Sequence, residues 1–192
     1  HVFRHGMTTG RCDEDPTRAL RGALTARAAV QHASVGADEF PALLLAIARY
    51  DRVGERTTGL ALQLLALTFV PVADLLGATW GEIDDRAALW IIPASRAAAH
   101  QAHAVPLSRQ SVRILSELRD LGTGGPHVLA GRFGAPMVHN TLLFALRRLG
   151  YGGRMTLAGF RTRAGALLAA EGFPADLVAV QMARHPRKAA PD

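Results

Sequence analysis

Two arginines lie two residues apart in the stretch "MTLAGFRTRAG", residues 155–165. The guanidinium group donates paired hydrogen bonds to phosphate or carboxylate oxygens. The stretch follows a glycine-rich turn, "LGYGG", and opens an apolar segment that predicts a core helix. Arg161 therefore either binds a phosphate group or pairs with a carboxylate at the start of the helix. We expect Arg163 to be a solvated or phosphate-facing neighbour without a catalytic role.

Three further arginines lie just before this stretch. Arg147 and Arg148 end a predicted helix, and Arg154 lies in the turn that follows. Cations suit the carboxyl end of a helix dipole, and arginines also contact DNA phosphates. Both interpretations stay open, and we predict weak DNA binding by Arg147, Arg148, Arg154 and Arg163.

Histidines and the single cysteine offer little metal chemistry. His100 and His103 lie three apart in an alanine-rich stretch, but a lone pair at this spacing is more typical of a solvated loop than of a metal site. Cys12 is the only cysteine, so no internal disulfide can form and a reducing compartment fits. We predict no metal site and a cytoplasmic protein.

The charge balance favours an acidic partner. The 192 residues include 22 Lys or Arg against 16 Asp or Glu, a formal net charge of +6, and the one lysine is Lys188. Nucleic acid is the usual partner of such a chain, although a GC-rich genome also enriches arginine. The longest apolar run carries Gln63 and Asp74 and is broken by Pro71, which indicates a buried helix and no membrane span.

Hydrophobic periodicity predicts helices, then a small sheet, then helices again. The first helices are expected within 37–50, 56–70 and 72–78, with Asp38 as a cap and Pro71 as the end of the second. Short strands are expected at 79–84, 88–93 and 103–107, with Trp80 and Trp90 in the core. Later helices are expected in the ranges 108–122, 139–150, 158–172 and 174–184.

Several residues mark the ends of these later helices. Ser108 and Asn140 are expected as amino-terminal caps, and Pro174 as a first helical residue. Gly122, Gly150 and Gly172 are expected as stops.

Several segments together resemble the phage-type tyrosine recombinases, and within them the P4-like integrases. These segments are "DPTRALRGAL", "LALTFVPVADLLGATWGEID", "ALWIIPASR", "HAVPLSRQ", "NTLLFALRRLGYGGRMT" and "GFRTRAGALLAAEGFPADLVAVQMA". The resemblance covers nearly the whole chain in order. It implies an α+β fold, mainly helical, with a three-stranded antiparallel sheet.

The resemblance also implies a chemistry. In the family a tyrosine hydroxyl attacks a DNA phosphodiester and forms a phosphotyrosine bond. Two arginines and a histidine hold the charge on the phosphate, and a lysine protonates the leaving 5′ oxygen. Neither a metal nor a nucleotide cofactor is needed, because the phosphotyrosine bond conserves the energy for rejoining.

Most of the implied catalytic positions hold other residue types in this sequence. The first arginine position holds Pro71, the lysine position falls near Ala98, and the histidine position holds Ala158. Arg161 keeps the arginine of the same motif, and Asp74 keeps the neighbouring acidic position.

The end of the motif series also departs from the pattern. The later histidine position holds Arg184, with His185 one place along; His185 is either that histidine displaced or a residue of a drifting tail. By the family's spacing the nucleophilic tyrosine lies beyond residue 192, and Tyr50 and Tyr151 match other positions. We expect both ends to be cut from a longer protein.

The resemblance implies three segments: residues 1–14 as the end of a helical core-binding domain, 15–36 as a linker, and 37–192 as a truncated catalytic domain. The implied partners are duplex DNA and other copies of the chain on DNA, as a tetramer in the family. We predict an integrase domain that does not cleave DNA. The alternative is a non-enzymatic DNA-binding remnant or regulator that reuses the fold.

Overall fold

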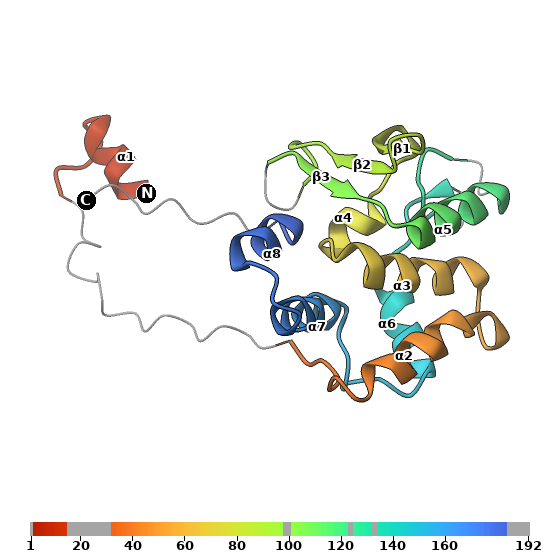
Figure 1. Ribbon diagram of the computed structural model, residues 1–192. Helices are drawn as coiled ribbons and strands as arrows, with labels where there is room; N and C mark the ends of the chain where they lie inside the picture. Colours follow the sequence, from red (N-terminus) through yellow and green to blue (C-terminus); the bar gives the residue numbers. More distant parts are fainter. Residues whose placement is uncertain (1, 15–31, 98–100, 123–124, 132–133, 184–192) are drawn as a thin grey trace. The chain divides into compact units, whose positions relative to one another are not determined.

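The computed structural model describes residues 2–14, 32–97, 101–122, 125–131 and 134–183 (Figure 1). The chain divides into two compact units, residues 1–31 and 32–192, which we describe separately. The first unit contains helix α1, Val2–Thr8, which confirms the helix expected at this end. Gly10 follows with a positive φ of 65°, and its N–H bonds to the carbonyl of Met7 in a turn.

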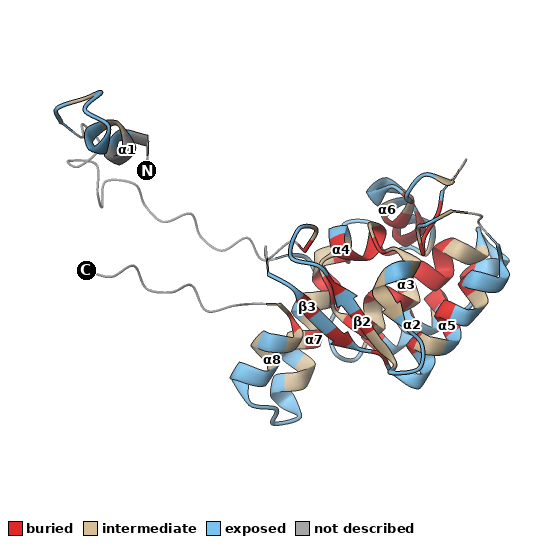
Figure 2. Ribbon diagram, turned by 90° about the horizontal axis from the view of Figure 1, so that it is seen from above, coloured by how far each residue is buried: buried red, intermediate tan, exposed pale blue. Residues whose placement is uncertain are grey.

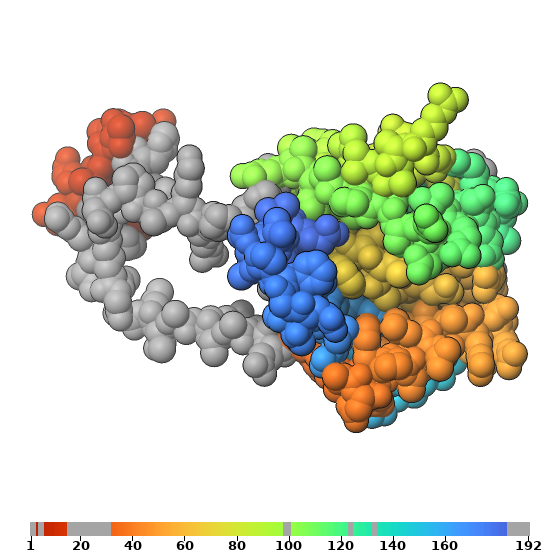
Figure 3. Space-filling model, in the orientation of Figure 1, coloured from red at the N-terminus to blue at the C-terminus, as the bar shows by residue number. Residues whose placement is uncertain are grey.

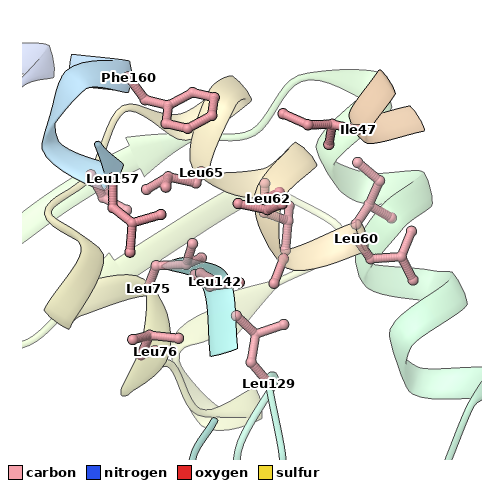
Figure 4. Close-up of a cluster of buried hydrophobic side chains, with 14 of the residues drawn as sticks. Ile47, Leu60, Leu62, Leu65, Leu75, Leu76, Leu129, Leu142, Leu157 and Phe160 are labelled. Atoms are coloured by element: carbon pink, nitrogen blue, oxygen red, sulfur yellow. The ribbon is translucent and has the colours of Figure 1, made fainter. Parts of the chain in front are cut away.

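The second unit is built around helix α3, Arg56–Thr68. Its sequence is apolar on nearly every side, and the buried residues cover all faces of the helix, as expected for a central helix. Helix α2, Phe40–Ala48, and the short 3₁₀ helix η2, Tyr50–Arg52, pack against it. Figure 4 shows Leu60, Leu62 and Leu65 of α3 inside the cluster of buried side chains.

The end of α3 corrects one expectation. Pro71 was expected to end the helix, but α3 ends at Thr68, and Phe69 takes the left-handed conformation with φ of 58°. Pro71 instead precedes helix α4, Val72–Leu76, where its fixed φ suits the residue before a helix. The chain therefore turns sharply between two helices at 69–71.

The predicted three-stranded antiparallel sheet is confirmed, with the order β1-β2-β3. Its strands are β1, Ile83–Asp84, β2, Leu89–Ile92, and β3, His103–Pro106. Trp90 pairs with Val105 and Ile92 with His103, and these four side chains are buried on one face. Trp80 was expected on a strand in the core; it begins the 3₁₀ helix η3, Trp80–Glu82, where it is half-buried.

Four more helices complete the unit: α5, Arg109–Asp120, α6, His139–Arg148, α7, Leu157–Ala170, and α8, Ala175–Gln181. Ser108 caps α5 as expected, since its hydroxyl accepts the N–H of Ser111. Gly122, Gly150 and Gly172 have positive φ after their helices, as expected for stops. Figure 2 shows how α8 exposes much of its surface, whereas α3 is mostly buried.

Some expected helix boundaries are wrong. Asn140 lies inside the first turn of α6, whose cap position is held by Val138, and Asp38 lies one residue before Glu39, the cap position of α2. Pro174 holds the cap position of α8 and is not its first helical residue. Cap residues were assigned from type alone, and each of these helices begins without a side-chain cap.

Candidate functional site

The first turn of α7 positions Arg161. Thr156 caps this helix: its hydroxyl accepts the N–H of Gly159 at 2.9 Å and donates to the carbonyl of Ala33 at 3.1 Å. The main chain at Ala33 passes so close that a Cβ on Gly159 would lie 2.3 Å from the Ala33 carbonyl oxygen. Phe160 is buried and packs edge-on against Phe40. The start of α7 is therefore fixed from two sides.

Arg161 connects α7 to the end of α8. Its Nη2 donates to the main-chain carbonyl of Met182 at 2.5 Å, and its side chain is half-buried. Met182 itself is buried, so the guanidinium joins two packed elements. The sequence offered a phosphate or a carboxylate as partner, and it did not anticipate this carbonyl. The role of Arg161 toward phosphate stays a prediction.

Arg163 is less exposed than a solvated side chain. It is half-buried, and its Nε is fully buried with no hydrogen-bond partner among the described residues. Burying a guanidinium N–H without an acceptor is unfavourable by about 1–3 kcal/mol. The solvated interpretation is therefore wrong for part of this group, and the phosphate-facing one stays a prediction.

Two of the substituted positions lie at the starts of α4 and α7. Pro71 precedes α4 and is half-buried, and Ala158 lies in the first turn of α7. Neither side chain carries a hydrogen-bond donor. Asp74, in contrast, is 98% buried within α4.

A cleft joins the segment before Pro71 to the helices on either side of Arg161. Phe69 lines it together with Leu168 of α7 and residues of α8, and its volume is about 450 Å³. In Figure 3 the blue surface of α7 and α8 borders the gold and yellow surface of α3 and α4. Three exposed apolar side chains, Phe173, Leu177 and Val180, lie along it.

The sequence analysis missed an ion pair that anchors the connection between β2 and β3. Arg96 donates through Nε and Nη2 to both carboxylate oxygens of Glu82, and through Nη1 to the main-chain carbonyl of Asp74 at 2.7 Å. The indole N–H of Trp90 also donates to Glu82, at 2.9 Å. This cluster holds the connection against α4, close to the position of Ala98.

The surroundings of Glu82 have opposing effects on its pKa. Burial raises the pKa, but the hydrogen bonds from Arg96 and Trp90 outweigh it, and the net pKa lies below the ordinary value. The carboxylate is thus charged at neutral pH. Spacing alone gives no signal for this cluster, because its three acceptors and donors come from η3, β2 and the following loop.

Several predicted positions lie outside the described residues: Ala98, His100, Arg184 and His185. His103, expected in a solvated loop, begins β3 and is 95% buried. The described residues contain no group of three or more His, Cys, Asp or Glu side chains that could hold a metal ion. Within the same residues no helix is long and apolar enough to cross a membrane.

The arginines proposed for DNA binding have partners of their own. Arg148 donates to the carbonyl of Val53 at 2.9 Å, and Arg147 lies over the ring of Phe144. Arg154 forms two hydrogen bonds with the carboxylate of Glu39, at 2.6 and 2.8 Å. These contacts are exposed, so each is weak and can be exchanged for a phosphate.

Comparison with known proteins gives this arrangement a family. A description of the phage integrase family matches residues 35–187. The integrase of Enterobacteria phage P4 is 30% identical over 91% of this chain and 43% of its own length. The prophage integrase IntA of Escherichia coli is 31% identical over 95% of this chain and 44% of its own length. The chain thus spans less than half the length of these two relatives.

Solved structures share the fold. The Tn1549 transposon integrase, in complex with transposon right end DNA, superposes with a TM-score of 0.68 over 94% of this chain and 66% of that one, at 12% identity. A lambda integrase tetramer bound to a Holliday junction gives 0.65 over 99% of this chain and 57% of that one, at 17% identity. The mainly helical unit with its three-stranded sheet is therefore the tyrosine recombinase catalytic-domain fold, and the chain belongs to the phage integrase family.

Proposed function

We propose that this chain is an integrase-type domain that binds duplex DNA and does not itself cleave it. The observation that carries this proposal is the setting of Arg161, a half-buried arginine at a rigid helix start beside positions that carry no donor. A guanidinium there can hold a phosphate oxygen. The partners that activate the phosphate in the family have no counterpart at Pro71 and Ala158.

Duplex DNA is the partner that the observations support. The chain has a formal net charge of +6, and the similar solved proteins hold transposon-end DNA and a Holliday junction. The exposed arginines Arg147, Arg148 and Arg154 would add backbone contacts that carry no sequence information. We propose that residues 37–192 bind one side of the duplex and that a core-binding domain, of which 1–14 is the end, binds the other across the 15–36 linker.

Cleavage needs groups that these side chains do not supply. Proline has no donor and alanine presents only a methyl group, so neither can stabilise charge on a non-bridging oxygen. Removing one such donor typically lowers the rate by about 10²–10³-fold. Tyr50 and Tyr151 are 96% and 91% buried in the core, so neither hydroxyl can take the place of the nucleophile.

The second candidate, a regulator that reuses the fold, follows from the same site. A domain that keeps its arginine and lacks the donors could occupy an integrase site and assemble with active copies on DNA. We place either protein in the cytoplasm of a bacterium, as part of a mobile element.

A salt titration tests the proposal. A labelled duplex is titrated with the full chain by fluorescence anisotropy at several KCl concentrations. The logarithm of the affinity should fall linearly with the logarithm of the salt concentration, by roughly 0.9 per phosphate contacted. Arg161→Ala should weaken binding, whereas Arg113→Ala, an exposed arginine on α5, should change it less. A response independent of salt would remove the DNA-binding function.

A further inference from the structure

A second cleft lies where two helices begin, away from the one beside Arg161. Its volume is about 700 Å³, and it is lined by Thr57 and Thr58 of α3, Thr141 of α6, and the loop 130–137. Helices α3 and α6 pack against each other, so their first turns face the same space. The first N–H groups of a helix have no acceptor within it and carry partial positive charge.

Neither helix covers its own amino terminus. Glu55, at the cap position of α3, makes no side-chain capping hydrogen bond, and the cap position of α6 holds Val138, which has no acceptor. The two sets of N–H groups are therefore available to a ligand in the cleft. An anion at such a point interacts with both helix dipoles.

The buried hydroxyl of Thr58 is an independent sign of a ligand. Thr58 is 96% buried, it lines the cleft, and its hydroxyl forms no hydrogen bond with another described residue. Elsewhere in the fold such hydroxyls are used: Thr68 donates to the carbonyl of Leu64 at 2.8 Å, and Thr156 caps α7. A buried donor without an acceptor is unfavourable, and an oxygen-rich ligand would satisfy it.

The wall opposite the helices is held in place. Ala130 and Pro136 form an isolated β-bridge, the N–H of Gly131 bonds to Ala135 at 2.6 Å, and Met137 bonds back to Leu129 at 2.8 Å. Leu129 is buried in the core (Figure 4). The cleft is thus a built feature of the fold.

We propose that this cleft binds a phosphate group through the amino termini of α3 and α6 and the hydroxyls of Thr57, Thr58 and Thr141. The carboxylate of Glu55 also lines it and opposes the anion, which keeps the affinity modest. A phosphate of the DNA backbone and free inorganic phosphate share this chemistry. Only the DNA source rests on the proposed function.

The test uses the full chain labelled with ¹⁵N. Inorganic phosphate is added at constant ionic strength, and the amide signals at the starts of α3 and α6 are expected to shift in a saturable way. Chloride at the same ionic strength is the control. If phosphate leaves these amides unmoved, or if chloride moves them equally, the site does not exist.

Three variants refine the result. Thr58→Val keeps the shape and should weaken phosphate binding about fivefold while leaving the thermal melt unchanged, because the hydroxyl makes no internal hydrogen bond. Glu55→Gln should strengthen it about threefold. Thr162→Val, an exposed threonine on α7, should change neither. Equal affinity in Thr58→Val would overturn the assignment of the hydroxyl and with it the proposal.

A duplex arm identifies the source. If the phosphate belongs to DNA, adding duplex displaces inorganic phosphate from the cleft, and Thr58→Val lowers the salt dependence of DNA binding. If the duplex binds without displacing it, the cleft is a site for free phosphate. Failure of DNA binding leaves the inorganic phosphate arm unaffected, so the two proposals are tested separately.

Discussion

Replacing Arg96 by alanine should destabilise the domain more than any other single loss of an exposed or half-exposed ion pair. The side chains of Arg96 and Glu82 are 24% and 10% exposed, so the carboxylate left behind stays largely out of water. Removing one partner of a buried pair costs about 3–5 kcal/mol. Partial exposure of Arg96 reduces this to about 2–3 kcal/mol.

Urea unfolding followed by circular dichroism measures this change. For a chain of this length about 2–3 kcal/mol corresponds to a melting point lower by roughly 4–10 °C. Arg119→Ala is the matched control, because its ion pair with Asp85 has side chains 50% and 43% exposed and should cost about 1 kcal/mol or less.

The pH dependence separates electrostatics from packing. The pKa of Glu82 is lowered in the folded state, so its stabilising effect is present above the ordinary value of 4.5 and is lost as the pH falls through the folded-state pKa. In Arg96→Ala burial raises the pKa of Glu82 instead, and the variant regains stability relative to the parent as Glu82 is protonated. The difference in unfolding free energy should therefore shrink between pH 7 and pH 4. A difference that stays constant, or that equals the Arg119→Ala value, would refute the reasoning.

Two further predictions concern the elements around the site. Gly159→Ala should lower the unfolding free energy by about 2 kcal/mol or more, since its Cβ meets the Ala33 carbonyl oxygen, and it should shift the α7 amides in an NMR spectrum; an unchanged melt would contradict the close approach. Ser108→Ala should cost about 1 kcal/mol in the same melt through loss of the cap on α5, whereas Ser116→Ala, an exposed serine of α5, should cost little; equal effects would show that the cap is not the cause.

The fold was predictable because long-period patterns dominate it. The apolar run of α3, the alternation of Trp90 and Ile92 on β2, and the glycine stops at 122, 150 and 172 each follow from local sequence. The errors occur where tertiary contacts decide: Trp80 lies on a 3₁₀ turn, with Arg119 stacked over its ring at 4.6 Å, and the caps of α2 and α6 carry no capping side chain.

The candidate site was predictable only in part. Residue types at Pro71, Ala158 and Arg161 could be read from motif positions, but the partner of Arg161 could not, because Met182 lies 21 residues later and contributes a main-chain atom. The Arg96–Glu82 pair and the unsatisfied hydroxyl of Thr58 depend on which elements pack together. Single-sequence patterns do not carry that information.

The central claim is that this chain keeps an integrase fold and has lost the cleavage step. A nicked duplex that traps covalent protein–DNA products tests it most directly, with an active member of the family as the positive control. After incubation and denaturing electrophoresis, we predict no covalent adduct with this chain, although the anisotropy titration shows binding to the same DNA. A covalent adduct at any tyrosine would contradict the account.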